Sequence, residues 1–177
     1  KILKKEVLVV GAGIKTGLNI RIDNPTQLGS DLVVDSVAAI AEYPAPLLIF
    51  DMGTANTVCV IDKNKNYIGG MIYPGIGVSL DSLTAHASQL GGISLEAPEH
   101  IIGKNTAECM KSGTIYSSAA AIDGIIDRLT EELDGEVTVI ATGGLANKVV
   151  PYCRRKIILD DNLLLKGLAV IYRKNRK

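Results

Sequence analysis

The segment LLIFDMGTANTVCVID at residues 47–62 constrains the fold more than any other part of the chain. Apolar runs precede Asp51 and follow a Gly53-Thr54 turn, which is typical of two buried strands joined as a hairpin. Tight hairpins usually turn on Asn-Gly or Gly-X, and a carboxylate at the end of a buried strand is costly without a partner. We therefore predict that this turn binds phosphate and a cation, with an ordinary polar hairpin turn as the alternative.

The pattern on either side of the hairpin predicts an α/β domain of ribonuclease-H type. Residues 67–73 form a third expected strand, so the chain begins its sheet as an antiparallel meander. Helices are expected at residues 31–42, 79–89, 105–133 and 161–172, and further short strands at 6–10, 137–141 and 157–159. Strands followed by alternating helices and strands require a mixed sheet with helices on both faces.

Composition narrows the class of protein. The 177 residues, 47% of them apolar, suffice for one large domain or two small ones. A formal net charge of zero gives no field that would draw the protein to nucleic acid or anionic lipid. Three cysteines without a CxxC spacing argue against a disulfide framework or a zinc site and favour reduced thiols in the cytoplasm. No apolar run approaches the length of a membrane span.

Two further glycine-containing segments are candidates for ligand binding. Thr142-Gly143-Gly144 follows an expected strand, where paired glycines admit a phosphate or a flat ligand, although a simple strand-to-helix turn explains them equally well. Gly103-Lys104-Asn105-Thr106 resembles the end of a P-loop, but the upstream glycine spacing is wrong and Walker A is rejected. As a helix start it would cap the helix through Asn105, or hold an anion.

Asp31 follows Gly29-Ser30 at the start of an expected helix. Aspartate is a common N-cap, and taken alone this is the simpler explanation. As a functional residue it would be a carboxylate kept ionised by the helix N-terminus and ready to accept a proton.

Several longer motifs occur together in a fixed order. They are KTGLNIRIDNP (15–25), GSDL (29–32), DMGTANT (51–57) with GGMIYPGI (69–76), and IGKNT (102–106) with SG (112–113) and ATGGLA (141–146). In this order they resemble the type III pantothenate kinase family across nearly the whole chain. The resemblance implies the actin-like ATPase superfamily, with two ribonuclease-H-like domains around a nucleotide. Residues 1–30 would then be a remnant of the first domain and residues 31–177 the second.

The same resemblance implies an activity and its requirements. The family phosphorylates pantothenate with ATP to 4'-phosphopantothenate, the first step of coenzyme A biosynthesis, in the cytoplasm and as a homodimer. It uses a monovalent cation, K⁺ or NH₄⁺, with Mg²⁺ accompanying the nucleotide. Neither nucleic acid nor a membrane is an expected partner.

The resemblance also assigns roles to single residues. Asp31 matches the catalytic proton acceptor, Asp51 the monovalent-cation ligand and Thr54 a nucleotide contact. The 142–144 turn falls where the superfamily places adenosine, and we expect Asp31 and Asp51 to face one shared cleft. The substrate-binding residues would be Gly29, Ser30, Asp31, Leu32 and Thr106.

The chain departs from the family pattern in two main respects. The DxGNT loop that cradles the ATP phosphates in the family is absent from these residues. Leu32 stands where the family has arginine, and leucine cannot donate paired hydrogen bonds to a carboxylate or phosphate. These departures favour an alternative, a non-catalytic or degenerate relative that acts as a binding or regulatory protein. Another sugar- or acetate-type kinase is a third possibility, which the pantothenate-kinase motifs argue against.

Overall fold

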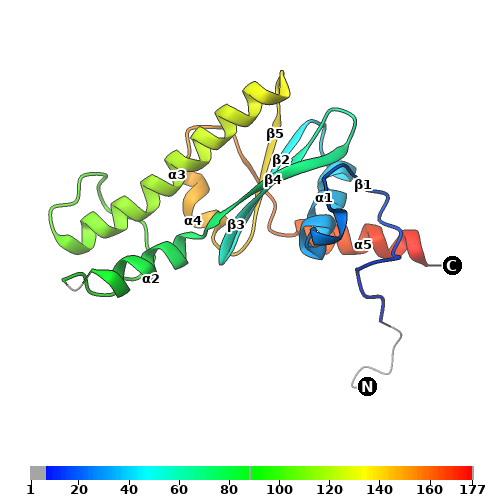
Figure 1. Cartoon of the computed structure of the whole chain (residues 1–177). Helices are drawn as coiled ribbons and strands as arrows, with labels where there is room; N and C mark the ends of the chain where they lie inside the picture. Colours follow the sequence, from blue (N-terminus) through cyan, green and yellow to red (C-terminus); the bar gives the residue numbers. More distant parts are fainter. Residues whose placement is uncertain (1–6, 88, 177) are drawn as a thin grey trace.

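A computed structural model describes residues 7–87 and 89–176, which fold around one six-stranded mixed sheet (Figure 1). The strands lie in the order β1-β4-β3-β2-β5-β6, β3 runs antiparallel to both of its neighbours, and the other pairs are parallel. Their bounds are β1 (Asn19–Ile20), β2 (Leu47–Met52), β3 (Ala55–Ile61), β4 (Asn66–Pro74), β5 (Thr138–Thr142) and β6 (Ile158–Leu159). The predicted ribonuclease-H-like sheet is thus confirmed, including its antiparallel meander.

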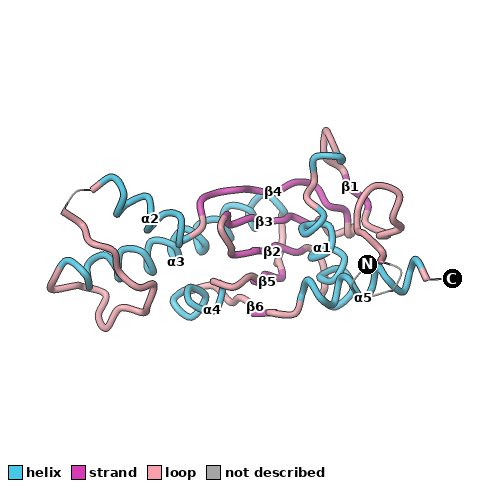
Figure 2. The backbone as a smooth tube through the Cα atoms, turned by 90° about the horizontal axis from the view of Figure 1, so that it is seen from below, coloured by secondary structure: helices cyan, strands magenta, loops and turns pink. Residues whose placement is uncertain are grey.

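Helices cover both faces of this sheet. In Figures 1 and 2, α3 and α4 lie on one side of it, with α2 beside α3, while α1 and α5 lie together on the other side. Their bounds are α1 (Ser30–Glu42), α2 (Ile76–His86), α3 (Thr106–Leu133), α4 (Ala146–Val149) and α5 (Leu163–Asn175), with short 3₁₀ turns at Pro25–Gln27 and Val150–Tyr152.

Alternation along β2 divides the core into two layers. Leu48 and Phe50 belong to the buried cluster beneath α3, whereas Leu47 and Ile49 belong to the cluster beneath α1. Successive side chains on a strand point to opposite faces, so Asp51 continues the α1 side. The order of residues in this one strand therefore directs the carboxylate of Asp51 toward α1.

Most predicted elements are confirmed, and three differ. No regular structure forms at residues 7–10, where Val7 and Val9 are each 74% exposed, because a strand needs a pairing partner; the rest of that predicted strand, Glu6, lies outside the described residues. The helix expected at 79–89 instead begins at Ile76, directly after the turn at Gly75, and ends at His86. The last helix is shifted to residues 163–175.

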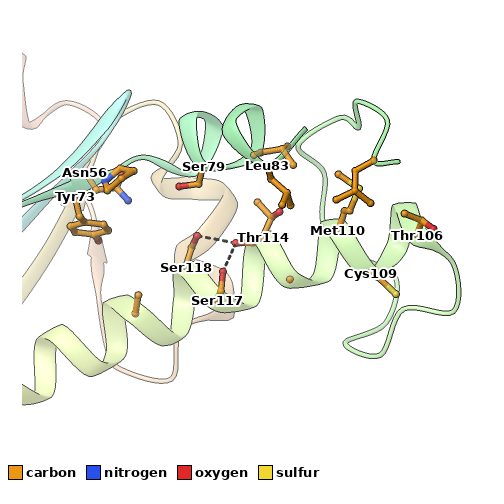
Figure 3. A pocket seen from close by; sticks show the side chains of 15 residues that line it. Asn56, Tyr73, Ser79, Leu83, Thr106, Cys109, Met110, Thr114, Ser117 and Ser118 are labelled. Atoms are coloured by element: carbon orange, nitrogen blue, oxygen red, sulfur yellow. Dashed lines mark hydrogen bonds between the residues drawn. The ribbon is translucent and has the colours of Figure 1, made fainter. Parts of the chain in front are cut away.

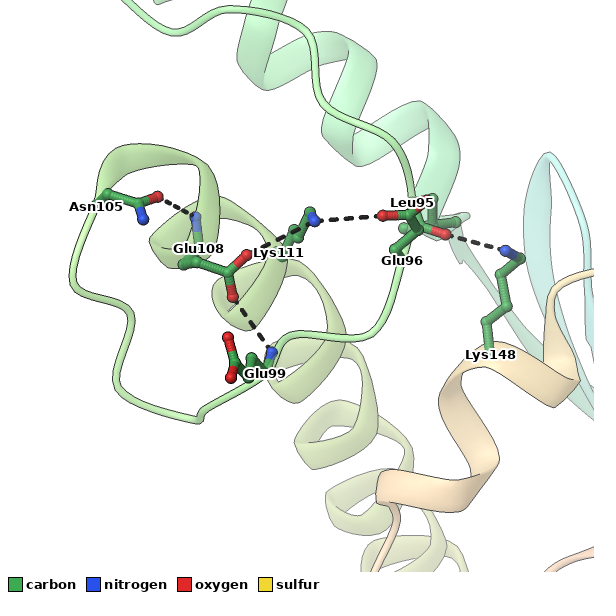
Figure 4. Close-up of polar contacts among 7 residues, drawn as sticks. All are labelled: Leu95, Glu96, Glu99, Asn105, Glu108, Lys111 and Lys148. Atoms are coloured by element: carbon green, nitrogen blue, oxygen red, sulfur yellow. Dashed lines mark hydrogen bonds and ion pairs between the residues drawn. The ribbon is translucent and has the colours of Figure 1, made fainter.

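The start of α3 is fixed by a network of polar contacts (Figure 4). The Asn105 side chain accepts a hydrogen bond from the Glu108 N–H at 3.0 Å, which confirms the predicted N-cap. The Glu108 carboxylate accepts from the Glu99 N–H at 3.2 Å, and Lys148 of α4 donates to the Leu95 carbonyl at 2.9 Å. The irregular segment 91–104 is thereby tied to both helices.

The division of the fold into a remnant at residues 1–30 and a second domain at 31–177 stays a prediction. Within the described part of the N-terminal segment, Leu18, Ile20 and Leu28 pack against the core cluster beneath α1. Among the described helices, none is long and apolar enough to cross a membrane.

Candidate functional site

Carboxylates from α1, β2 and the β6–α5 turn meet at one cavity of about 540 Å³, which we call the acidic cavity. Asp31 and Asp35 come from the first turns of α1, Asp51 from the end of β2 and Asp161 from the turn before α5. The 142–144 turn after β5 completes the wall. Asp31 and Asp51 thus share a cavity.

Local geometry explains why these side chains meet. Asp31 and Asp35 are four residues apart on α1, so they lie on the same side of the helix. Asp51 points to the sheet face that α1 covers, and it pairs in register with Thr142 of β5. One helix face and one strand position therefore direct three carboxylates into the same space.

The charges in the acidic cavity oppose one another. Asp35 is only 2% exposed and its Oδ1 atom has no hydrogen-bond partner. Burial, with the nearby charges of Asp51 and Asp31, raises the Asp35 pKa to about 7. Burial and then Asp31 raise the pKa of Asp51 as well. Among the described residues, no lysine or arginine forms an ion pair with these three carboxylates. The cavity therefore favours a positively charged occupant.

The donors around Asp51 are hard oxygen atoms, which suit alkali and alkaline-earth cations. Within residues 7–87 and 89–176, no three Asp, Glu, His or Cys side chains are grouped closely enough to enclose one metal ion. An ion at Asp51 would consequently take most of its ligands from backbone oxygens, hydroxyls and water. This donor set fits a weakly held monovalent cation better than a closed metal cage.

The turn after β5 packs tightly against the end of β2. Gly143 has a φ of +92°, and a Cβ atom on it would lie 2.5 Å from Oδ1 of Asp51 and 2.6 Å from the backbone of Met52. The Leu145 N–H donates to the Met52 carbonyl at 3.2 Å, which fixes the turn against the strand. Glycine is required at 143 both by the backbone conformation and by the closeness of Asp51.

We expect Gly143→Ala to lower the free energy of unfolding by about 2 kcal/mol. Alanine is strained at a positive φ, and its Cβ would collide with Asp51. Gly144→Ala is the matched control, since its Cβ would meet no atom within 4 Å, and its cost is expected to stay within about 0.5 kcal/mol. Urea denaturation of both variants measures the difference. Equal stability of the two variants would contradict the tight packing described for Gly143.

A second pocket of about 460 Å³ lies beside the acidic cavity, and we call it the α1 pocket. Gly29 and Leu32 of the GSDL motif line it, together with Leu28 and Ile22. A Cβ atom on Gly29 would collide with Oδ1 of Asp31, so this carboxylate extends over the glycine that forms the pocket wall. Asp31 therefore lines the acidic cavity and also lies against Gly29, a residue of the α1 pocket.

On the sheet beneath α1, residues of the acidic cavity are register neighbours of residues of the α1 pocket. Register pairs join Thr142 to Asp51, Asp51 to Thr57 and Thr57 to Ile72, and paired residues project to the same face. The first two residues line the acidic cavity and the last two the α1 pocket. Oγ1 of Thr57 is buried and has no hydrogen-bond partner. It is thus a buried polar group near the junction with unused hydrogen-bonding capacity.

Other predicted site residues lie apart from this junction. Ser30 is the exposed first residue of α1, and Gly29, not Asp31, is the N-cap, so the N-cap interpretation of Asp31 is wrong. Thr54 is exposed on the β2–β3 turn, where its carbonyl accepts from the Gly75 N–H at 3.0 Å. Among the described residues, neither Ser30 nor Thr54 lines the acidic cavity or the α1 pocket.

Thr106 lies at a third and larger cavity of about 770 Å³ between α2, α3 and the ends of β3 and β4 (Figure 3). This cavity is on the α3 side of the sheet, where Asn56 and Tyr73 carry buried polar atoms without partners. Its lining holds hydroxyl, apolar and thiol groups but no carboxylate. Within this chain, Thr106 is therefore separated from Asp31 and Asp51, and its cavity, although larger than the acidic cavity, holds none of the acidic groups.

Sequence reasoning missed Asp35, Asn147 and Asp161, which also line the acidic cavity. Asp35 carried a usable signal, because it falls four residues after Asp31 among the apolar residues of one helix. Asp161 is brought in by its neighbour Asp160, which accepts hydrogen bonds from Tyr43 and Lys166, each at 2.8 Å. These hydrogen bonds connect the end of α1 to the start of α5, and no local sequence pattern predicts them.

The family model and the curated relatives agree on one family. The sequence model of the family described as type III pantothenate kinase matches residues 1–128. A type III pantothenate kinase of Exiguobacterium sp. is 47% identical over 96% of this chain, and that of Bacillus cytotoxicus is 45% identical over 99%. These matches cover 66% and 67% of the relatives, so the chain spans about two thirds of their length.

Solved structures share the fold at lower identity. A Campylobacter jejuni protein described as a conserved Baf family transcriptional activator superposes with a TM-score of 0.57 at 23% identity, over 90% of this chain and 70% of that one. Component A of the (R)-2-hydroxyglutaryl-CoA dehydratase of Acidaminococcus fermentans has a TM-score of 0.50 at 16% identity, over 80% and 66% of the two chains. These likenesses concern the fold alone.

The family model matches most of the chain, and the curated relatives are similar to it over nearly all of its residues. The chain belongs to the type III pantothenate kinase family.

Proposed function

We propose that the protein carrying this chain transfers the γ-phosphoryl group of ATP to the primary hydroxyl of pantothenate, giving 4'-phosphopantothenate for coenzyme A synthesis. The observation that carries the proposal is the shared cavity of Asp31 and Asp51, together with the closeness of the Asp31 carboxylate to Gly29, which lines the α1 pocket. A phosphoryl donor and an alcohol acceptor need two adjoining spaces with a base between them. The type of reaction is inferred from family membership. We assign the phosphoryl donor to the acidic cavity and the alcohol acceptor to the α1 pocket.

Asp31 is the proposed proton acceptor. Its carboxylate stands in the first turn of α1. From this position it would receive the proton of the acceptor hydroxyl as that oxygen attacks the γ-phosphorus. Gly29 and Leu32 would contact the acceptor in the α1 pocket, and Ser30 would contact it from the same loop.

Asp51 is the proposed ligand of a monovalent cation, K⁺ or NH₄⁺. A cation held there would offset the negative charge shared by the phosphates and the surrounding carboxylates. The 142–144 turn is the proposed adenosine site, Thr54 a further nucleotide contact, and Mg²⁺ would accompany ATP. Since phosphoryl transfer depends mainly on positioning and charge neutralisation, these groups account for the roles that the chain itself supplies.

Thr106 is a proposed substrate contact. Within a single chain it lies away from Asp31, because Thr106 lines a cavity on the other side of the sheet. We infer that this contact is made within a homodimer, with Thr106 of one copy facing the acceptor held by the other. The three free cysteines, one of them exposed, fit a reducing compartment, and we propose the cytoplasm as the location.

The proposal is tested on the complete protein with ATP, Mg²⁺ and pantothenate. ADP is expected to appear only when pantothenate is present, and its rate is expected to fall at least tenfold when K⁺ is replaced by tetramethylammonium. A coupled assay for ADP measures both dependences. A folded protein that binds ATP but releases no ADP with pantothenate and K⁺ would rule out the kinase and favour the non-catalytic alternative.

A further inference from the structure

Resting on the proposed function, we propose that the last turn of α5 positions the acceptor side of the site, with Asn175 and Lys174 as positioning residues. Within the described part of the chain, neither side chain lines the acidic cavity or the α1 pocket. Both instead hold the segment at residues 15–18, which leads directly into the wall of the α1 pocket. Their effect on the acceptor is therefore indirect.

Residues 7–18 form neither a helix nor a strand, so their backbone groups need partners outside regular secondary structure. The adjacent α5 supplies three such contacts (Figure 1). The Asn175 side chain accepts a hydrogen bond from the Lys15 N–H at 3.0 Å and donates one to the Lys15 carbonyl at 2.9 Å. Lys174 donates to the Thr16 carbonyl at 2.8 Å. One helix turn thus holds two consecutive residues from the opposite end of the sequence.

The position of these donors and acceptors is fixed because α5 packs closely on α1. Ile171 is buried in one cluster with Val34 of α1. A Cβ atom on Gly167 would collide with the Val34 carbonyl oxygen, so the two helices are in backbone contact there. Asn175 also donates to the Ile171 carbonyl at 2.8 Å, which orients its amide on its own helix.

Gly17 gives the lysine access to the backbone. Its φ is +79°, and a Cβ atom at this position would collide with Nζ of Lys174. The Leu18 N–H then donates to the Thr16 hydroxyl at 3.1 Å, and the Leu18 side chain packs against the core clusters beneath α1. The contact of α5 with Thr16 is thereby passed on to Leu18.

The held segment continues into the acceptor side. β1 follows at once and pairs only with the first two residues of β4, and so short a strand is marginal by itself. The Arg21 N–H donates to the Tyr67 carbonyl at 2.8 Å, and the next residues, Ile22 and Asp23, line the α1 pocket. If residues 15–16 were released, this wall would occupy several positions. The apparent affinity for the acceptor would fall with the fraction that fits it.

The nucleotide side has a separate anchor at the other end of α5. Asp161 lines the acidic cavity. The carboxylate of its neighbour Asp160 accepts hydrogen bonds from Tyr43 and Lys166, each at 2.8 Å. α5 has 13 residues and is therefore about 20 Å long, which separates this network from Asn175. Loss of the contacts at Asn175 is consequently expected to affect the acceptor and not ATP.

Asn175→Ala removes both hydrogen bonds to Lys15. With the complete protein, ATP, Mg²⁺ and K⁺, its KM for pantothenate is expected to rise about tenfold, while kcat and the KM for ATP stay within about twofold. Lys174→Met keeps the aliphatic stem but loses the donor to Thr16, and it is expected to raise the KM for pantothenate about threefold. Steady-state assays of ADP formation measure these constants.

Arg173→Ala is the matched control. Arg173 is an exposed cation on the same turn of α5 and forms no ion pair with the described residues, so its KM for pantothenate is expected to stay within about twofold of wild type. Circular dichroism checks the folding of each variant. Lys174→Met decides the question if Asn175→Ala fails to fold.

Hydrogen exchange followed by mass spectrometry reports the position of the segment without depending on turnover. In Asn175→Ala and Lys174→Met, the amides of residues 18–22 are expected to exchange at least threefold faster than in wild type. Those of residues 33–39 in α1, which are buried, are expected to keep the wild-type rate. A purely general loss of stability would instead accelerate exchange in both segments.

The possible outcomes separate the two proposals. An unchanged KM for pantothenate in the folded variants would overturn the positioning role of α5 and leave the kinase proposal intact. An equal rise in the KM for ATP, or unaltered exchange at residues 18–22, would also overturn that role. If the folded wild-type protein released no ADP with pantothenate, the proposed function would fail, and exchange at residues 18–22 would still decide whether α5 holds the segment.

Discussion

Asp31→Asn is expected to lower kcat for ADP formation by about a thousandfold while changing the KM for ATP by less than about threefold. The amide keeps the shape of the side chain but accepts no proton, so only the step that activates the acceptor hydroxyl is lost. Asp31 stands at the junction of the acidic cavity and the α1 pocket, where its removal leaves the 142–144 turn and Asp51 in place. Steady-state assays at saturating pantothenate measure the effect.

Asp81→Asn is the matched control, because Asp81 is an exposed aspartate on α2 that lines neither the acidic cavity nor the α1 pocket. Its kcat is expected to stay within about twofold of the wild-type value. If Asp31→Asn retained more than a tenth of the wild-type rate, Asp31 would not be the base. A large rise in the KM for ATP would instead assign Asp31 to nucleotide binding.

Asp35→Asn is expected to stabilise the protein increasingly as the pH rises. The folded-state pKa of Asp35 is about 7 against an ordinary value of 3.8, because the carboxyl is buried beside Asp51 and Asp31. Between these two values the folded protein binds more protons than the unfolded chain, so the wild-type protein loses stability with rising pH over this interval. Above pH 7 the full penalty applies, at most about 4 kcal/mol.

The measurement is the difference in the free energy of unfolding between Asp35→Asn and wild type at pH 5 and pH 8. We expect this difference to grow by up to about 3 kcal/mol in favour of the variant. Comparing the two pH values removes any constant effect of the amide itself. Asp161→Asn, an exposed change at the same cavity, is the control for removing a carboxylate there without altering a buried group. A pH-independent difference for Asp35→Asn would show that Asp35 does not titrate near neutrality in the folded protein.

Removing the charge of Asp35 has a consequence for the cation as well. The acidic cavity would lose one of its four carboxylates, none of which forms an ion pair within the described part of the chain. The charge of Asp35 is one of the reasons that the cavity favours a positive occupant. The same ionised carboxylate that destabilises the folded protein above neutral pH would also attract a cation bound in the cavity.

Local patterns predicted much of the fold. Apolar runs and glycine turns located β2, β3 and β4, because short strands with buried side chains have a distinct composition and clear boundaries. The Asn105 cap located the start of α3, because a capping side chain acts on a backbone group three residues away. The strand predicted at residues 6–10 fails at residues 7–10, since its propensity is local but strand formation depends on a partner.

The candidate site was predictable only in part. Asp31, Asp51 and the 142–144 turn were each identified by a motif, and they line one cavity. Thr106 was identified in the same way but lies across the sheet, since a local motif does not specify which face of the sheet its residues will reach. Asp35 was missed because its burial, and the proximity of Asp51, arise from the packing of α1 on the sheet.

The sequence by itself determined which side of each element carries its polar groups: alternation in β2 places Asp51 with Leu47 and Ile49, and helical spacing places Asp31 with Asp35. Only the tertiary structure decided that α1 covers that face of β2, so that the carboxylates meet, and that Leu32 lines a pocket beside them. Sequence and tertiary structure divide the outcome in this way because the periodicity of a strand or helix is fixed by neighbouring residues. The packing of one element on another depends on burying apolar surface from distant parts of the chain.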